Sequence, residues 1–462
     1  MAEPWATLGI DLLVEPTGPG LRRGLTDALR EAVRSGRLAP GTRLPSSRAL
    51  AADLGIARNT VADAYADLVA EGWLTARQGS GTRVAERQVV PPSGTAPHPR
   101  ALTRPAYDLR PGSPDLASFP RAEWLKAARR ALTAAPYQAL DYGDPRGRPE
   151  LRAALAGYLS RARGVRADPE RIVVCAGISQ GLRLLGTVLR ARGVRTVAVE
   201  SYGLDVHGRI LAGSGLGTTV LPFDRLGTDP GGLAAAEAVL LTPAHQFPMG
   251  VPLHRDRRTA VVDWARRTGG VVLEDDYDGE FRYDRQPVGA LQGLDPDRVV
   301  YLGTASKSLA PGLRLAWMVL PPGLAEETAA AKGGVDMCGA LDQLTLAEFL
   351  TSGAYDRHVR ATRLRYRRRR DALVAAVAAR APEARVTGIA AGLHVLLRLP
   401  PGTEQSVVQA AHWRGLALHG LARYTDPAAS AEPVDALVVG YGTPPDHAWS
   451  GALDALCAVL PG

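Results

Sequence analysis

The sequence predicts two domains of different fold, a small winged helix-turn-helix followed by a large α/β domain, in a chain of 462 residues. Over residues 16–86, two short helical patterns separated by a glycine turn precede a hairpin pattern. From Asp108 to the end at residue 462, short β-branched runs alternate with long helical patterns, which is typical of a mostly parallel sheet. Residues 87–107 are rich in proline and lack periodicity, so we interpret them as an extended linker.

Composition restricts the class of protein. The chain has 46% hydrophobic and 22% charged residues, which are ordinary values for a globular protein. It has no apolar run long enough for a membrane-spanning helix and no signal segment at residues 1–10, so we expect a cytoplasmic protein with no membrane partner. The scattered cysteines Cys175, Cys338 and Cys457 predict neither a disulfide framework nor a metal site. The net charge of +8 is compatible with a polyanionic partner.

The N-terminal region has the pattern of three short helices and a hairpin. Ser46 and Ser47 suit the N-cap of the second helix, and Gly55 separates it from a third helix that begins near Arg58. The hairpin turn is expected at Gly79–Gly81. The side chains expected in the core of this domain are Leu21, Leu25, Leu29, Val33, Leu50, Leu54, Val61, Ala64, Tyr65 and Leu68.

A winged helix-turn-helix is a shape that binds DNA. Its third helix would present Arg58, Asn59 and Thr60 to base edges in the major groove, while Arg48 would hold phosphates. Residues 1–86 contain ten arginines and ten acidic residues. Charge therefore leaves open the alternative of a protein-interaction module.

Several motifs of this region resemble the GntR family of bacterial transcription factors. They are Gly41-Thr-Arg-Leu-Pro-Ser-Ser-Arg-Ala-Leu-Ala, Arg58-Asn-Thr-Val, Ala64-Tyr-Ala-Asp-Leu, Glu71-Gly-Trp-Leu and Gly79-Ser-Gly-Thr. The resemblance covers residues 18–86 and implies a double-stranded DNA operator as partner. The complete set of predicted DNA contacts is Arg43, Ser46, Ser47, Arg48, Arg58, Asn59, Thr60 and Gly81.

In the large domain, turns that follow predicted strands contain the chemically informative residues. The turn Ala176–Gly181 opens a helix and suits a phosphate. Consecutive acids at Glu274–Asp278 are compatible with a magnesium site, a solvated strand end or a specific contact. The turn Gly303–Ser308 contains Lys307, one of only three lysines in an arginine-rich chain. The predicted strands are Ile172–Cys175, Thr196–Val199, Ala238–Thr242, Val271–Glu274, Arg298–Leu302 and Arg314–Leu320.

Together these turns supply the groups that pyridoxal 5′-phosphate needs. Lys307 offers the amine that an aldehyde cofactor requires, and Asp275 offers a carboxylate that keeps a pyridine nitrogen protonated. Tyr277 offers a donor to the phenolic oxygen of the ring. The phosphate would be held by hydroxyls, backbone N–H groups and an arginine, from Ser179, Thr304, Ser306 and Arg314.

The same region resembles fold-type I aminotransferases, and more narrowly the MocR subfamily of GntR regulators. The motifs are Tyr142-Gly-Asp-Pro-Arg-Gly, Thr242-Pro-Ala-His-Gln-Phe-Pro-Met-Gly, Glu274-Asp-Asp-Tyr-Asp-Gly-Glu-Phe-Arg-Tyr and Ser306-Lys-Ser-Leu-Ala-Pro-Gly-Leu-Arg. The resemblance implies an aminotransferase-like effector domain over residues 108–462, a homodimer, and Arg423 as the group that takes a ligand carboxylate. The full predicted cofactor set is Lys307, Asp275, Tyr277, Arg314, Ser306, Thr304, Ile178, Ser179 and Tyr202.

Two positions depart from the pattern of these families. Where the subfamily has Glu-Asp-Pro-Gly-Tyr, this chain has Glu200-Ser-Tyr-Gly-Leu, so the aromatic that stacks on the pyridine ring is replaced by Leu204, or by Tyr202 from a shifted position. Phe247 replaces the asparagine that donates to the phenolic oxygen of the ring, which argues against efficient turnover.

The sequence thus predicts a ligand-responsive transcription regulator, not an enzyme. Its effector would be a small amino compound or pyridoxal phosphate itself, and its targets would be genes of vitamin B6 or amino-compound metabolism. The alternative is a working aminotransferase with an accessory N-terminal domain, in which Lys307 would be the catalytic residue. The basic stretch Arg357–Arg370 is interpreted as a solvated helix face.

Overall fold

The computed structural model describes residues 20–77, 81–86, 105–283, 288–429 and 434–461, and divides the chain into two compact units, residues 1–104 and 105–462. The expected domain start at residues 16–19, the turn residues Gly79 and Ser80, and linker residues 87–104 lie outside the described ranges. Tyr107–Asp108 forms a strand, β3, that pairs with β15 (Leu416–Ala417), so the large unit includes Tyr107, which the sequence analysis placed at the end of the linker. No helix in the described part of the chain is long and apolar enough to cross a membrane.

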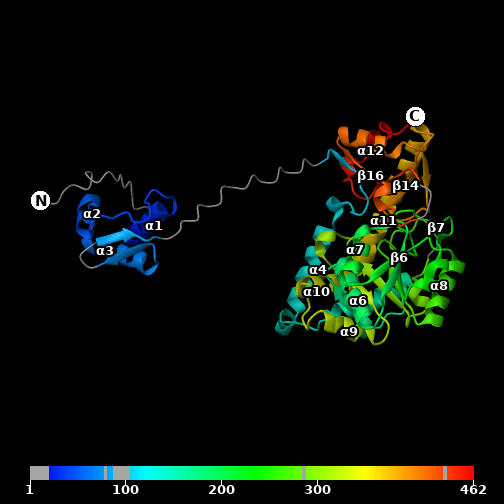
Figure 1. Ribbon diagram of the computed structural model, residues 1–462, viewed down its shortest axis with the longest axis horizontal. Coiled ribbons are helices and arrows are strands. Elements are labelled where there is room, and N and C mark those ends of the chain that lie inside the picture. The colour runs from blue at the N-terminus through cyan, green and yellow to red at the C-terminus, as the bar shows by residue number, and fades with distance from the viewer. Residues whose placement is uncertain (1–19, 78–80, 87–104, 284–287, 430–433, 462) are drawn as a thin grey trace. The chain divides into compact units, whose positions relative to one another are not determined.

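The N-terminal unit consists of three helices and a two-stranded hairpin (Figure 1). Helices α1 (Leu21–Arg34), α2 (Ser47–Leu54) and α3 (Arg58–Ala70) precede the antiparallel strands β1 (Leu74–Arg77) and β2 (Gly81–Val84). These elements share one core, which is formed by Leu25, Leu29, Val33, Leu50, Val61, Ala64, Tyr65, Leu68, Leu74 and Val84.

Local chemistry explains where these helices begin and end. The Ser46 side chain accepts a hydrogen bond from the Ala49 N–H at 3.1 Å, so Ser46 is the N-cap of α2. Gly55 ends the helix in the left-handed conformation that glycine adopts readily. Leu21, expected in the core, is 55% exposed because it is the first residue of α1. Leu54, also expected in the core, is half-buried.

The centre of the large unit is a seven-stranded sheet with the order β4-β12-β11-β10-β9-β5-β6. All pairs are parallel except those of β12 with β11 and with β4. The predicted strand at Arg314–Leu320 begins only at Ala316, because Arg314 has a left-handed backbone (φ 51°). The strands are β4 (Ile172–Cys175), β5 (Thr196–Glu200), β6 (Gly217–Leu221), β9 (Ala238–Leu241), β10 (Val271–Asp275), β11 (Val299–Thr304) and β12 (Ala316–Val319).

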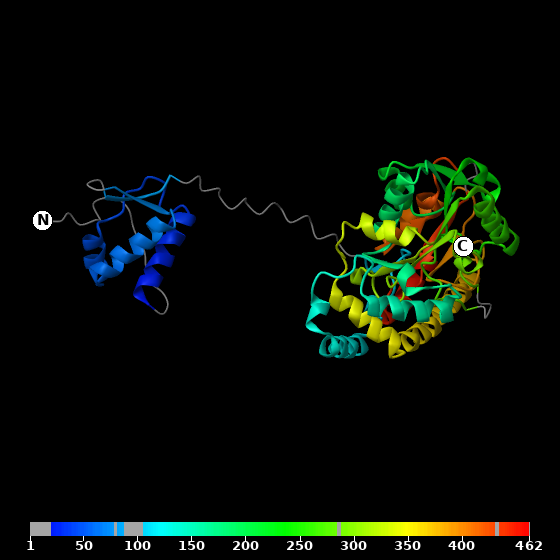
Figure 2. The ribbon, with the colours of Figure 1, turned by 90° about the horizontal axis from the view of Figure 1, so that it is seen from below.

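Helices cover both faces of this sheet, because side chains alternate along each strand (Figures 1 and 2). Val173 and Cys175 of β4 pack with helices α6 (Ile178–Ala191) and α9 (Leu324–Ala331). Ile172 and Val174 face the opposite side, where they pack with helices α5 (Pro149–Arg163) and α10 (Ala340–Thr351). Helix α8 (Arg255–Thr268) covers the same side beneath β5, β9 and β10, and α4 (Arg121–Ala134) packs on α10. Helix α7 (Asp205–Gly213) packs with α6 on the other face, and the short strands β7 (Phe223–Asp224) and β8 (Gly227–Thr228) pair with each other.

The C-terminal elements form a second layer around a four-stranded sheet, coloured orange and red in Figures 1 and 2. Its order is β13-β14-β17-β16, from β13 (Arg385–Thr387), β14 (His394–Arg398), β16 (His419–Gly420) and β17 (Ala436–Gly440). Helices α11 (Ala354–Arg380), α12 (Glu404–Trp413) and α13 (Trp449–Cys457) share its core with Leu109.

The arginine-rich part of α11 differs from the solvated face that its sequence predicted. Arg369 is only 3% exposed and donates to the carbonyls of Tyr441 (3.2 Å) and Pro444 (2.7 Å). Arg363 donates to the carbonyl of Glu280. Part of this basic run therefore joins the helix to neighbouring loops, since a guanidinium has enough donors to satisfy several carbonyls at once.

A buried ion pair connects α5 to the end of β10. The Arg163 Nε atom lies 2.6 Å from Asp276 Oδ2, both side chains are at most 5% exposed, and the Tyr301 hydroxyl donates to the same carboxylate at 2.8 Å. Replacing Arg163 by Met would leave a buried carboxylate without its cation. We expect the free energy of unfolding to fall by about 3–5 kcal/mol, measured from the urea midpoint of the full chain.

The matched control for this substitution is Arg380→Met, which breaks the exposed pair with Asp454. The control should change stability by less than about 1 kcal/mol. If both variants shifted the urea midpoint equally, the structural role given to Arg163 would be wrong.

Candidate functional site

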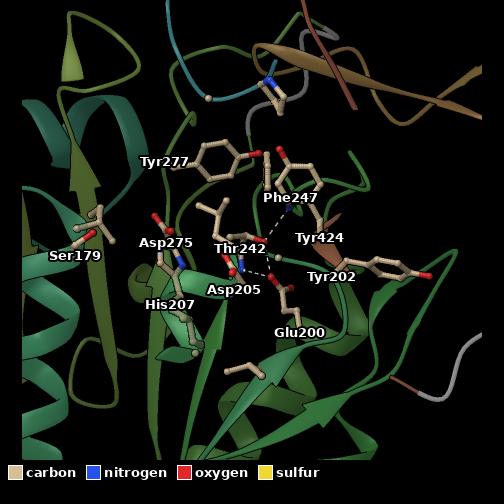
Figure 3. Close-up of a pocket in the computed structure, with 18 of the residues that line it drawn as sticks. Ser179, Glu200, Tyr202, Asp205, His207, Thr242, Phe247, Asp275, Tyr277 and Tyr424 are labelled. Carbon is tan, nitrogen blue, oxygen red and sulfur yellow. Dashed lines mark hydrogen bonds between the residues drawn. The ribbon is translucent and has the colours of Figure 1, made fainter. Parts of the chain in front are cut away.

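A pocket of about 620 Å³ opens at the carboxyl ends of the parallel strands of the large unit (Figure 3). In such sheets these ends meet at one edge, so turns far apart in the sequence come together there. The pocket wall includes every residue of the predicted cofactor set and Arg423: Ile178, Ser179, Tyr202, Asp275, Tyr277, Thr304, Ser306, Lys307, Arg314 and Arg423.

Lys307 follows β11 and has its amine inside this pocket. Its Nζ atom donates to the Gly112 carbonyl at 2.5 Å. Burial lowers the pKa of Lys307, although Asp275 and Asp278 oppose the change. A lowered pKa favours the neutral amine, which is the nucleophilic form.

Three of the four acids in the Glu274–Asp278 motif are held by other parts of the protein. Glu274 accepts hydrogen bonds from the N–H groups of Leu291 (2.6 Å) and Gln292 (2.8 Å). Asp276 pairs with Arg163, and Asp278 Oδ2 lies 2.8 Å from His245 Nδ1. Because each acid has a different protein partner, neither a shared magnesium site nor a solvated strand end describes this motif.

Asp275 is the exception in this motif. Its Oδ1 atom is buried and has no hydrogen-bond partner among the residues that the structure describes. Burial raises the pKa of Asp275 to about 7, against the influence of Lys307. A buried carboxylate oxygen without a donor is costly. The protonated nitrogen of a pyridine ring would supply the missing donor.

The Tyr277 hydroxyl belongs to a buried polar cluster that the sequence did not single out. It lies 3.1 Å from His245 Nδ1, which also contacts Asp278. Burial and the neighbouring acids raise the pKa of Tyr277 well above its usual value, so the hydroxyl keeps its proton and can donate it. The motif Thr242-Pro-Ala-His includes His245, so the sequence offered this residue as a candidate. Its role could be assigned only from the structure, which shows its contact with Asp278.

Phe247 occupies its predicted place beside Tyr277 and supplies no donor. Its ring lies 5.9 Å from the Tyr277 ring and 5.1 Å from the Tyr424 ring, both edge-on. The Phe247 N–H donates to the Thr242 hydroxyl (3.2 Å), which in turn lies 2.5 Å from Glu200 (Figure 3). This chain of contacts fixes the aromatic ring at the pocket wall.

The opposite end of the pocket has the features of a phosphate site. Gly177 precedes α6 with a φ of 93°, and a Cβ there would collide with Arg314 Nη2. Arg314 donates to the Ala176 carbonyl at 2.6 Å, so its guanidinium lies over the start of α6. The first N–H groups of a helix have no partner within the helix and favour an anion. The hydroxyls of Ser179, Thr304 and Ser306 line the same region.

The two residues proposed for ring stacking, Tyr202 and Leu204, both line the pocket. Tyr202 is 4% exposed, its ring packs edge-on against Phe223 at 5.7 Å, and Figure 3 shows it pointing away from Asp275. Leu204 is 41% exposed. The Tyr202 ring packs in a neighbouring hydrophobic cluster, so its stacking role stays a prediction that this packing does not favour.

Arg423 lies in a short 3-10 helix, Leu421–Tyr424, at the edge of the pocket. Its side chain is exposed, and its charge contributes with burial to lowering the pKa of His419 to about 4. A cation at this position is available to a carboxylate of a bound ligand.

In the N-terminal unit, the arginines separate into two groups. Arg22 and Arg30 of α1 pair with Asp67 (2.6 Å) and Glu71 (2.8 Å) at α3. The predicted DNA-contact arginines are exposed, and their side chains have no hydrogen bond or ion pair with any described residue: Arg43, Arg48 and Arg58.

The other predicted DNA contacts lie at the same helix starts and at the hairpin. Asn59 is exposed, and Thr60 is half-buried within the first turn of α3. Ser46 caps α2 and Ser47 is its first residue. A Cβ on Gly81 would lie 3.2 Å from Arg43 Nε, so the Arg43 side chain runs along the hairpin.

Comparison with known proteins agrees with this division. The model of bacterial regulatory proteins of the gntR family matches residues 21–84, and that of aminotransferase class I and II matches residues 108–423. A solved Pyrococcus horikoshii kynurenine aminotransferase is 25% identical with a TM-score of 0.68, and the match covers 78% of this chain and 91% of that one.

Two regulators are similar over most of the chain. The HTH-type pyridoxine biosynthesis transcriptional regulator PdxR of Corynebacterium glutamicum is 35% identical, and 89% of each chain is covered. The probable rhizopine catabolism regulatory protein MocR of Rhizobium meliloti is 33% identical, with 77% of this chain and 76% of that one covered. In this chain a gntR-type domain precedes an aminotransferase domain, and the two regulators above are at least 33% identical to it over most of its length. The chain therefore belongs to the MocR subfamily of GntR-family transcriptional regulators.

Proposed function

We propose that this protein is a transcription regulator that binds pyridoxal 5′-phosphate through Lys307 and changes its affinity for a DNA operator in response to that cofactor or to an amino compound. The observation that carries the proposal is the Asp275 carboxylate, buried without a donor in the same pocket as the Lys307 amine. Because a DNA-binding domain lies on the same chain, a ligand in this pocket could change the affinity of the protein for DNA.

The residues present fit pyridoxal phosphate at each of its polar groups. Asp275 would hold the pyridine nitrogen and Tyr277 would donate to the phenolic oxygen. Ser179, Thr304, Ser306, Arg314 and the start of α6, including Ile178, would hold the phosphate. When bound, the cofactor supplies an aldehyde that reacts with amines. The buried Lys307 is the amine of this chain that is placed for that reaction.

The regulator is favoured over a working aminotransferase by two features. Phe247 removes a donor to the phenolic oxygen, which weakens the hold on the ring. The exposed arginines Arg48 and Arg58 have no described partner in the protein, as expected for groups that contact DNA. The complete set of Lys307, Asp275 and Arg423 nevertheless supports an aminotransferase as the second candidate. Amino-group transfer between an amino acid and a keto acid, measured with the purified protein, would distinguish the two.

The target genes are proposed from the relatives. PdxR is named for pyridoxine biosynthesis and MocR for rhizopine catabolism, so we propose genes of vitamin B6 or amino-compound metabolism. The exposed Arg423 favours an effector with an acidic group. We further propose a homodimer in the cytoplasm, because operators with two half-sites need two reading helices.

The cofactor assignment predicts a visible absorbance band. Pyridoxal phosphate attached to Lys307 should give this band in the wild type, and Lys307→Ala should abolish it because the variant has no amine at this position. Lys126→Ala is the matched control, since Lys126 is exposed on α4, away from the pocket, and should leave the band unchanged. A band of equal intensity in Lys307→Ala would contradict the assignment.

The DNA assignment predicts a loss of operator affinity in Arg58→Ala. With an operator selected from random DNA, we expect binding to weaken by about 1–3 kcal/mol if Arg58 contacts a base, measured by fluorescence anisotropy at fixed salt. Arg34→Ala is the control, because Arg34 pairs with Glu31 on the exposed face of α1 and should change the affinity little. Equal losses in both variants would show that net charge, and not the start of α3, determines binding.

A further inference from the structure

We infer that His207 is the residue that faces the ring of the bound cofactor, at the place where the sequence suggested Leu204 or Tyr202. This inference rests on the proposed binding of pyridoxal phosphate. It adds a positioning residue that neither the motifs nor the comparisons assign.

The local fold places His207 in the pocket. His207 is the third residue of α7, and its N–H donates to the Leu204 carbonyl at 2.9 Å, which folds the chain back after β5. Its side chain lines the same pocket as Asp275 and Lys307, and in the view of Figure 3 the imidazole is drawn on the same side of the pocket as Asp275. The imidazole thus shares the pocket with the two groups that would hold the cofactor nitrogen and aldehyde, and the Lys307 charge acts on it.

No described residue holds the imidazole by a hydrogen bond. The hydrogen bond of His207 within the described ranges is made by its backbone N–H. The other histidine in the pocket lining, His394, differs in this respect, because its ring contacts the Pro248 carbonyl at 3.2 Å. The His207 ring is therefore available for contact with a ligand.

The charge state of His207 suits contact with a positively charged ring. Burial lowers the pKa of His207 to about 4, and the Lys307 cation acts in the same direction. The imidazole is then neutral at pH 7. A neutral aromatic face attracts a protonated pyridine, whereas an imidazolium would repel it.

The other aromatic side chains of the pocket are committed elsewhere. Tyr202 packs on Phe223, and Phe247 lies edge-on to both Tyr277 and Tyr424. Figure 3 shows Phe247 and Tyr424 on the far side of Tyr277 from His207. Among the residues that the structure describes, the His207 ring is consequently a pocket aromatic ring with no side-chain hydrogen bond or ring contact of its own.

The test compares three single variants of the full-length protein. We expect His207→Ala to raise the dissociation constant for pyridoxal phosphate about three- to tenfold, the range of an aromatic ring contact. It should also weaken the visible circular dichroism per bound cofactor, because the pyridine ring would lose the imidazole that fixes its orientation. His207→Phe should restore both values. His412→Ala should match the wild type, because His412 is exposed on α12 and does not line the pocket. The urea midpoint of each variant, compared with that of the wild type, checks that the large unit is folded.

The outcomes separate this inference from the proposal on which it rests. If the wild type binds the cofactor and His207→Ala binds it equally well with unchanged circular dichroism, the inference is overturned while the proposed function stands. The inference is also overturned if His207→Phe behaves like His207→Ala. If the wild type itself does not bind pyridoxal phosphate, both the inference and the proposed function are overturned.

Discussion

The arrangement of the large unit depends on the parallel strands that end at one edge of its central sheet. Strands β4, β5, β9, β10 and β11 run in the same direction, and each is followed by a turn that contributes to the pocket. Residues as distant in the sequence as Ser179 and Lys307 become neighbours only through this topology. The antiparallel strand β12 interrupts the sheet between β4 and β11 and places Arg314 over the start of α6.

Burial of charge at this edge then determines which groups remain free for a ligand. Around the end of β10, three acids have partners within the protein. Glu274 accepts hydrogen bonds from backbone N–H groups, Asp276 pairs with Arg163, and Asp278 contacts His245. Asp275 retains an oxygen without a donor and a raised pKa. Because an unpaired buried carboxylate is costly, the pocket is built to receive a cation or a proton donor at one defined position. The unpaired Asp275 oxygen explains why the site suits a protonated pyridine ring, which would donate a hydrogen bond to it.

Much of this could be predicted from the sequence, because local signals were strong. The helices and hairpin of the N-terminal unit followed from their apolar spacing and from Ser46 and Gly55, and the strand positions followed from β-branched runs. Strand β6 was missed because it is half-exposed and follows a glycine-rich stretch without a buried apolar pattern. The orientation of Tyr202 and the positions of His207 and His245 could not be predicted, since each depends on packing between distant segments. The buried arginines of α11 were misjudged for the same reason.

The central claim is that occupancy of the pocket changes DNA affinity. A ligand can do this only by binding two arrangements of the protein with different affinities, and such coupling is typically about 5- to 150-fold. The most direct measurement is the dissociation constant for a selected operator, with and without saturating pyridoxal phosphate, in the wild type and in Lys307→Ala. We expect a change of about fivefold or more in the wild type and none in the variant. An operator affinity that the cofactor leaves unchanged in the wild type would contradict the claim.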